Sequence, residues 1–268
     1  MMQLGTIRKL GWRKWARRRL DVPAAYAADM LLPKREDRRK LVIFAQGRTG
    51  STLLEKLLCS TGYFRESGEL LSSSFGEIRY PLRFVRGMAR MGPGSFVFHL
   101  KVYQLTRDRS RPVDPAGFLK ALQADGWKFV HLMRRNRLRH AFSNLLLEYR
   151  GHPQKLTNSE ERPKLVVDCS DLERIVDERF RFASDEQRAL EGIPHHRVVY
   201  EDDLEDSGRH QETVDGILEM MSLETRPVST ELRRINVYRL EELVENWDDV
   251  LQLLRRRGWE RFLNGPEG

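Results

Sequence analysis

The sequence predicts an α/β protein of three layers, α/β/α, in which helices cover both faces of a central, mainly parallel β-sheet. Short apolar segments rich in β-branched and aromatic residues lack the alternation of a half-exposed strand, as is typical of strands buried on both faces. Amphipathic segments of helical length separate them. Strands that alternate with helices favour a parallel sheet with crossover helices.

Four segments are expected to be strands and six to be helices. The strands are residues 41–44, 96–100, 128–133 and 197–200. The helices are residues 51–60, 115–124, 138–149, 170–191, 212–221 and 240–256, and several are followed by glycine, which helix C-termini favour. Residues 71–94 and 151–164 fit neither pattern. Long loops in a compact domain are usually functional, so we expect these two to form the rim of a binding site.

The 268 residues are expected to form one domain, residues 41–268, preceded by a basic arm, residues 1–40. The whole net charge of +8 lies in the arm, because the remainder has equal numbers of basic and acidic residues. In residues 7–20, basic side chains alternate with apolar ones. Two interpretations remain open for this segment: a helix in peripheral contact with an anionic membrane, or an arm that docks its tryptophans on the domain.

Composition excludes several classes of protein. No apolar run approaches the roughly 20 residues of a membrane helix, and no secretory signal is apparent, so we expect a cytoplasmic protein. Cys59 and Cys169 are too few for a disulfide framework or a zinc site, and no metal is predicted. The electroneutral domain argues against nucleic-acid binding.

A candidate anion site follows the first predicted strand. Gln46 and Gly47 lead into Arg48-Thr49-Gly50-Ser51-Thr52, and a helical segment follows. Backbone N–H groups at a helix start bind phosphate or sulfate, as in P-loop-like nucleotide-binding folds. Gly50 allows close approach, Ser51 and Thr52 offer hydroxyl donors, and Arg48 offers a guanidinium suited to oxyanions.

A metal-dependent nucleotide kinase is the first alternative interpretation of this loop. Its phosphate loop requires a lysine after the last glycine, whereas Gly50 is followed by Ser51. Its Mg²⁺ requires a carboxylate at a strand end, whereas the strand at residues 128–133 runs into Arg134 and Arg135. The second alternative is a non-catalytic protein that binds anionic surfaces through its basic arm.

Two motifs resemble those of the PAPS-dependent sulfotransferases, in which PAPS is 3′-phosphoadenosine 5′-phosphosulfate. Residues 48–52 resemble the phosphosulfate loop of the carbohydrate-acting branches. Arg135 at a strand end and Ser143 eight positions later are similar to the pair that holds the 3′-phosphate in that family. The resemblance extends over residues 41–262 and is greatest to bacterial sulfotransferases that act on sugars and glycolipids, including the trehalose sulfotransferase type. It implies the sulfotransferase fold and PAPS as the donor.

The resemblance also implies the catalytic residues. Arg48 and Lys101 would neutralise charge near the bridging oxygen, and no metal is required. The family's cytosolic eukaryotic members use a histidine as base where this sequence has Tyr103, a poor base near neutral pH. The carbohydrate branch places a glutamate after the first helix, which implies Glu69 as the base, with Glu66 as an alternative. The acceptor would be a hydroxyl on a carbohydrate or glycolipid.

Three further expectations concern structural residues. Glu201, after the last strand, is expected to brace or cap a loop, and the segment Glu245-Asn246-Trp247 is also expected to be structural. His99 and His131 lie in predicted strands and are expected to be satisfied sheet or core residues. The sequence predicts neither the oligomeric state nor the identity of the acceptor.

Overall fold

A parallel sheet of five strands forms the centre of the protein. The computed structural model describes residues 20–35, 37–72, 76–150, 165–232 and 239–263. The strands run in the order β2-β3-β1-β4-β5, and every neighbouring pair is parallel. Their bounds are β1 Lys40–Ala45, β2 Phe64–Arg65, β3 Ser95–Leu100, β4 Lys128–Met133 and β5 His196–Val199. The four predicted strands are confirmed. The fifth, β2, has two residues and therefore no sequence pattern.

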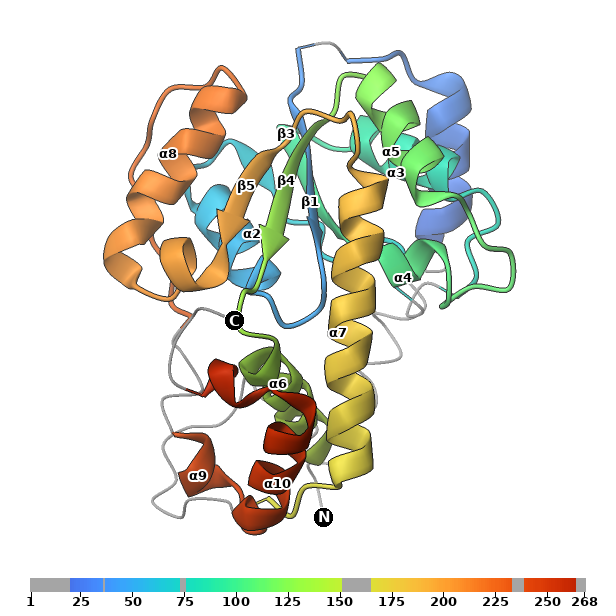
Figure 1. The fold of residues 1–268 in the computed structure, drawn as a ribbon. Coiled ribbons are helices and arrows are strands. Elements are labelled where there is room, and N and C mark those ends of the chain that lie inside the picture. Colours follow the sequence, from blue (N-terminus) through green and yellow to red (C-terminus); the bar gives the residue numbers. More distant parts are fainter. Residues whose placement is uncertain (1–19, 36, 73–75, 151–164, 233–238, 264–268) are drawn as a thin grey trace, which may run out of the picture.

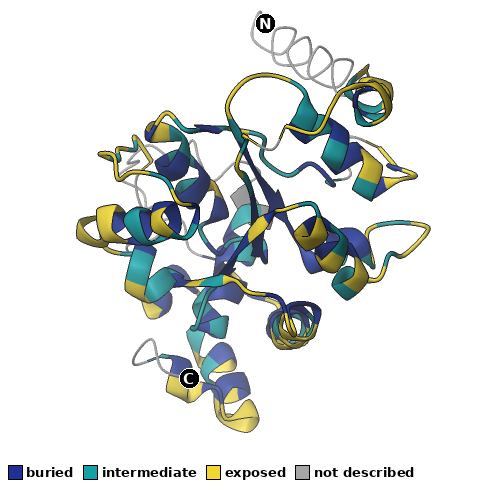
Figure 2. Ribbon diagram, turned by 90° about the horizontal axis from the view of Figure 1, so that it is seen from above, coloured by how far each residue is buried: buried dark blue, intermediate teal, exposed yellow. Residues whose placement is uncertain are grey.

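Helices cover both faces of the sheet, so the predicted three-layer α/β/α architecture is confirmed (Figure 1). Alternate residues of β1 enter different cores: Val42 and Phe44 face one side, and Leu41 and Ile43 the other. The first core contains residues of α3 Pro81–Arg90, α4 Val102–Leu105 and α5 Pro115–Ala124, and the second contains residues of α2 Ser51–Ser60 and α8 His210–Met220. Figure 2 shows the strands buried and the outer helix faces exposed.

A third core lies below the carboxyl ends of the strands in Figure 1. It joins α6 Arg137–Arg150, α9 Leu240–Leu243 and α10 Trp247–Arg257 to the first half of α7 Cys169–Ala189. The second half of α7 belongs to the first core, through Phe182 and Ala189. This helix therefore connects the lower lobe to the sheet.

The predicted helix at residues 240–256 is wrong, because the structure divides it into α9 and α10. Between them Val244 is extended and forms a parallel bridge with Leu165. The side chain of Asn246 accepts from the N–H of Val167 at 2.8 Å and donates to its carbonyl at 2.9 Å. Pairing with a segment distant in sequence thus interrupts the helix, and the expected structural role of Asn246 is confirmed.

The two predicted loops have different outcomes. Residues 71–94 contain α3, so the expectation of a loop throughout this stretch is wrong. Residues 151–164 lie outside the described part of the chain.

A helix whose described part is residues 20–31 packs against α3. A Cβ on Gly87 would lie 1.8 Å from the carbonyl oxygen of Ala25, so only glycine permits this contact. Residues 7–19, for which membrane contact was one interpretation, lie outside the described residues. Within the described ranges, no helix combines the length and the apolar character needed to cross a bilayer.

Candidate active site

Segments that follow four strands converge at the carboxyl edge of the sheet. Residues 46–50 follow β1, Lys101 follows β3, Arg134 follows β4 and Tyr200 follows β5. The carboxyl ends of β4 and β5 point toward the lower lobe, where α6 begins (Figure 1). This edge is where ligands bind in open parallel sheets.

The loop after β1 has a backbone suited to an anion. Gly50 is the N-cap residue of α2 with φ +94°, and a Cβ there would lie 2.9 Å from the Tyr200 ring, so glycine is required. Arg48 also has a positive φ, +71°, which is strained for a side-chain-bearing residue and is found most often at functional sites. No side chain caps the N-terminus of α2 and no acidic residue lies in its first turn, so the positive end of the helix faces the loop.

Arg48 lies between α6 and the end of β4. Its Nε donates to Oγ of Ser143 at 3.2 Å, which brings together two residues singled out by the sequence. The guanidinium of Arg134 donates to the carbonyl of Arg48 at 3.4 Å and lies 4.7 Å over the ring of Tyr200. Burial, with the charge of Arg134, lowers the pKa of Arg48. Two neighbouring cations at one loop favour an anion between them.

The three hydroxyl residues of the loop differ in their surroundings. Thr49 is buried, and its hydroxyl donates to the carbonyl of Gln46 at 2.8 Å, which stabilises the turn. Ser51 is also buried, in the first turn of α2, whereas Thr52 is exposed. Thr49 therefore shapes the loop, and Ser51 lies at the helix start.

Lys101 and Glu69 form an ion pair beside this loop. Lys101 is 8% exposed and lies at the end of β3, which is not an edge strand, so it is not a lysine that faces water. A Cβ on Gly47 would lie 3.4 Å from its Nζ, which places the ammonium against the phosphate loop. Gln104 donates to the other oxygen of Glu69 at 3.0 Å. The candidate base and a candidate cation are thus held together.

Glu55, which the sequence analysis did not single out, holds the segment that carries Glu69. It is buried on α2 and accepts hydrogen bonds from the backbone N–H groups of Ser67 and Gly68, at 2.9 and 2.8 Å. Its other oxygen lies 3.1 Å from Nε2 of His99, so His99 is a sheet residue in contact with a carboxylate. Because this buried Nε2 makes no hydrogen bond of good geometry among the described residues, the expectation that His99 is satisfied is not confirmed. Burial alone would raise the pKa of Glu55, but these contacts outweigh it and lower the pKa. In the sequence Glu55 is one polar residue within a helical segment, and this pattern gave no indication that it holds another segment.

Glu66, the alternative base, lies apart from this arrangement. It pairs with Lys56 at 2.6 Å, and its side chain is half exposed. The geometry therefore favours Glu69, the residue that contacts Lys101.

Arg135 points toward the segment after β5. Its guanidinium pairs with Asp202, and its backbone N–H donates to the carboxylate of Glu201 at 2.9 Å. Glu201 also accepts from the N–H of Asn136 at 3.2 Å, so its expected role as a brace is confirmed. Among the described residues no hydrogen bond or ion pair joins Arg135 to Ser143; the latter contacts Arg48 instead.

Two residues with no sequence motif complete the site. His140 is fully buried on α6, and its Nε2–H donates to the carbonyl of Gly47 at 2.6 Å. Burial and the charges of Arg179 and Arg134 hold the pKa of His140 well below its usual range, so this histidine is neutral.

Arg179, on α7, is 8% exposed, and its buried Nε has no hydrogen-bond partner among the described residues. It lies close enough to Tyr103 for their charges to interact. Burial raises the pKa of Tyr103, which makes it a still poorer base. No group of three or more His, Cys, Asp and Glu residues in the described ranges is arranged to hold a metal.

Solved structures with a similar arrangement of elements include two sulfotransferases. No protein-family model matches the chain, and no curated protein matches its sequence. A sulfotransferase from Alicyclobacillus acidocaldarius is 14% identical, with a TM-score of 0.49 over 84% of this chain and 96% of that one. The sulfotransferase domain from the curacin biosynthetic pathway is 12% identical, with a TM-score of 0.45 over 71% of this chain and 76% of that one. Similarity at this level does not define a family, and function must be argued from the site.

Proposed function

We propose that the protein is a sulfotransferase that moves the sulfuryl group of PAPS to an acceptor hydroxyl on a carbohydrate or glycolipid. The observation that carries the proposal is the convergence of Arg48 and Lys101 on a glycine loop at the uncapped N-terminus of α2. Cations and helix N–H groups together are suited to the 5′-phosphosulfate. The sequence resemblance supplies the donor and the acceptor class.

The reaction needs little covalent chemistry from the protein. The acceptor oxygen attacks sulfur in line, the bond from sulfur to the bridging oxygen breaks, and 3′-phosphoadenosine 5′-phosphate (PAP) leaves. Arg48 and Lys101 would neutralise the charge that develops on the leaving phosphate. Thr49, Gly50, Ser51 and Thr52 would form the cradle of the phosphosulfate.

Glu69 would remove the acceptor proton. In the structure its carboxylate pairs with Lys101. We expect the anionic donor to compete for the ammonium, which would free Glu69 for the acceptor hydroxyl. Donor binding would thereby prepare the base.

Arg135 and Ser143 would hold the 3′-phosphate. In the structure Arg135 pairs with Asp202, and Ser143 contacts Arg48. Both side chains would need to exchange these partners for phosphate oxygens. The ion pair of Arg135 has 31% and 46% exposed side chains, so its exchange costs little.

A nucleotide kinase fits the site less well. The loop lacks the lysine that follows the last glycine of a Walker sequence. The segment after β4 supplies Arg134 and Arg135 at a position where that chemistry needs a carboxylate for Mg²⁺. Mg²⁺-dependent binding of ATP in preference to PAP would favour the kinase.

The test measures transfer and binding separately. With ³⁵S-labelled PAPS and a cell extract, the wild-type protein is expected to label an acceptor, whose identification would give its class. Glu69→Gln and Lys101→Ala should abolish labelling yet still bind PAP, while Glu66→Gln serves as the matched control and should retain turnover. Arg135→Ala and Ser143→Ala should weaken PAP binding more than AMP binding. Equal losses for both nucleotides would contradict the 3′-phosphate assignment.

A further inference from the structure

A cavity lined mainly by cations lies at the edge of the sheet opposite the candidate active site. Its enclosed volume is about 30 Å³, and it opens to solvent at its mouth. Lys40, the first residue of β1, and Trp127, the residue before β4, both line it, which places it at the amino ends of the strands. The cavity is therefore separate from the site after the carboxyl ends.

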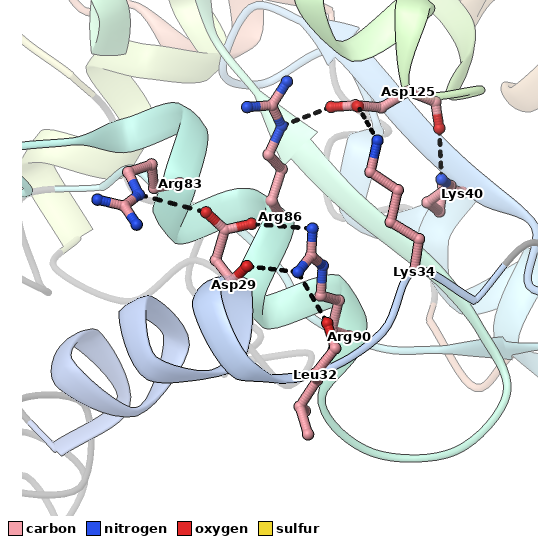
Figure 3. A network of polar contacts seen from close by, with 8 residues as sticks. All are labelled: Asp29, Leu32, Lys34, Lys40, Arg83, Arg86, Arg90 and Asp125. Carbon is pink, nitrogen blue, oxygen red and sulfur yellow. Dashed lines mark hydrogen bonds and ion pairs between the residues drawn. The ribbon is translucent and has the colours of Figure 1, made fainter.

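The charges around this cavity do not balance. Among the described residues that line it, Asp125 supplies one carboxylate against six cations: Lys34, Arg35, Arg38, Lys40, Arg86 and Arg90, of which Arg90 also pairs with Asp29. Asp125 pairs with Lys34 at 3.5 Å and with Arg86 at 2.5 Å (Figure 3). Arg38 donates to the backbone carbonyl of Arg90 at 3.3 Å, which does not neutralise its charge. Like charges gathered in this way repel one another unless an anion lies between them.

A purely structural network accounts for only part of this cluster. Asp29 pairs with Arg83 at 3.3 Å and with Arg90 at 3.2 Å, and these contacts fasten the helix at residues 20–31 to α3 (Figure 3). Lys34 makes only the long contact of 3.5 Å with Asp125, and both Lys34 and Arg35 are exposed at the mouth of the cavity. Their gathering around one carboxylate indicates a ligand of negative charge.

We propose that this cavity is a second anion site that binds a phosphate group. Guanidinium forks and lysine ammonium groups are the side chains that bind phosphate oxygens best. The phosphate can belong to a soluble ester or to the headgroup of an anionic phospholipid. Met30 and Leu31 are 68% and 78% exposed where the adjoining helix ends, so both sources need a test.

The first experiment titrates the ¹⁵N-labelled full-length protein with inorganic phosphate at low salt and follows the indole N–H signal of Trp127, assigned with Trp127→Phe. This signal is expected to shift saturably. The double variant Lys34→Glu, Arg35→Glu should weaken the response about tenfold, because it reverses two charges at the cavity mouth. Arg255→Glu, Arg256→Glu makes the same charge change on α10 and should leave the response intact. We call Lys34→Glu, Arg35→Glu the cavity variant. If its Trp127 signal shifts with phosphate as the wild-type signal does, the proposal is overturned.

The second experiment distinguishes the source of the phosphate. Sedimentation with vesicles of phosphatidylcholine, with and without phosphatidylserine, measures binding to a lipid surface. A headgroup ligand predicts binding to the anionic vesicles only, with an affinity about tenfold lower in the cavity variant than in the α10 control. A phosphate response of Trp127 without such vesicle binding assigns the site to a soluble phosphate ester. If the variant Lys34→Glu, Arg35→Glu changes neither the response of Trp127 to phosphate nor the binding to vesicles, the cluster is structural and the proposal is wrong.

Discussion

The guanidinium of Arg179 is buried in the candidate site, and neighbouring groups satisfy it only in part. Its Nε has no partner among the described residues, and burial lowers its pKa. Burying a cation without a partner costs free energy, and an anionic substrate would supply that partner. Arg179 is therefore expected to contact the donor or the acceptor.

Arg179→Leu is expected to leave the free energy of unfolding within about 1 kcal/mol of wild type, because it removes a desolvated charge whose Nε makes no hydrogen bond with the described residues. The same change should raise KM for donor or acceptor at least about tenfold. Arg179→Lys keeps the positive charge but loses the planar guanidinium, so its KM should lie between those of the wild type and Arg179→Leu. Urea unfolding and initial-rate kinetics measure the two effects. Lost stability with unchanged KM would make Arg179 a structural residue.

Glu55 is expected to position Glu69 without touching the substrate. Glu55→Gln keeps the shape but weakens the hydrogen bonds to Ser67, Gly68 and His99, and should lower the free energy of unfolding by about 1–3 kcal/mol. It should also lower kcat while PAP binding stays close to wild type. Glu66→Gln is the stability control, since its exposed pair with Lys56 contributes at most about 1 kcal/mol.

The pH dependence of Glu55 has a defined sign. The pKa of Glu55 is lowered in the folded protein. Its contribution to the free energy of unfolding is therefore complete above the ordinary carboxyl range and is lost as pH falls through the lowered pKa. The difference in stability between wild type and Glu55→Gln should therefore shrink in acid. A difference that stays constant down to acid unfolding would show that the charge of Glu55 is not what holds the segment.

At the scale of elements, α6 holds the phosphate loop through a histidine. His140 is neutral when folded, whereas in the unfolded chain it binds a proton below about pH 6.5. Stability should therefore fall as pH drops below that value, by up to about 1.4 kcal/mol per pH unit from this residue. His140→Gln can still donate to Gly47 but does not titrate. The slope of its stability against pH should therefore be smaller than that of the wild type by the contribution of one proton. Urea midpoints at pH 7.5, 6.5 and 5.5 measure both slopes, and equal slopes would contradict the assignment.

Elements with local sequence patterns were predictable, and those defined by distant contacts were not. Strands β1, β3, β4 and β5 are apolar because both faces are buried, so their sequences carry the information. The break between α9 and α10 depends on the bridge of Val244 with Leu165 and on hydrogen bonds of Asn246 to Val167. The intervening sequence retains helical periodicity and gives no indication of this pairing.

At the scale of the whole molecule, the candidate site joins the sheet to the lower lobe. Arg48 follows β1, whereas Ser143 lies on α6, whose apolar residues belong to the third core. A ligand that contacts both residues would bind only the assembled protein. Binding of such a ligand stabilises the folded state by mass action.

PAP at a concentration of 100 Kd is therefore expected to raise the free energy of unfolding by about 2.7 kcal/mol. AMP at the same concentration should stabilise less, because it lacks the 3′-phosphate proposed to lie on Arg135 and Ser143. Thermal unfolding monitored by circular dichroism measures both, with Ser143→Ala as the variant in which the difference between the two nucleotides should shrink. Equal stabilisation of the wild type by PAP and AMP would contradict the proposal.

The sequence by itself determined the three-layer class, four strands of the sheet and the loop at residues 48–52, because burial on both faces and turn chemistry leave local patterns. The family resemblance implied Lys101 as a cation and Glu69 as the base, each separately, and the fold places them in contact. Only the tertiary structure decided that Glu55 braces Glu69, that the buried Nε of Arg179 has no hydrogen-bond partner among the described residues, and that six cations line one cavity. Each of these depends on segments that are distant in sequence and meet only after folding, so no local pattern records them.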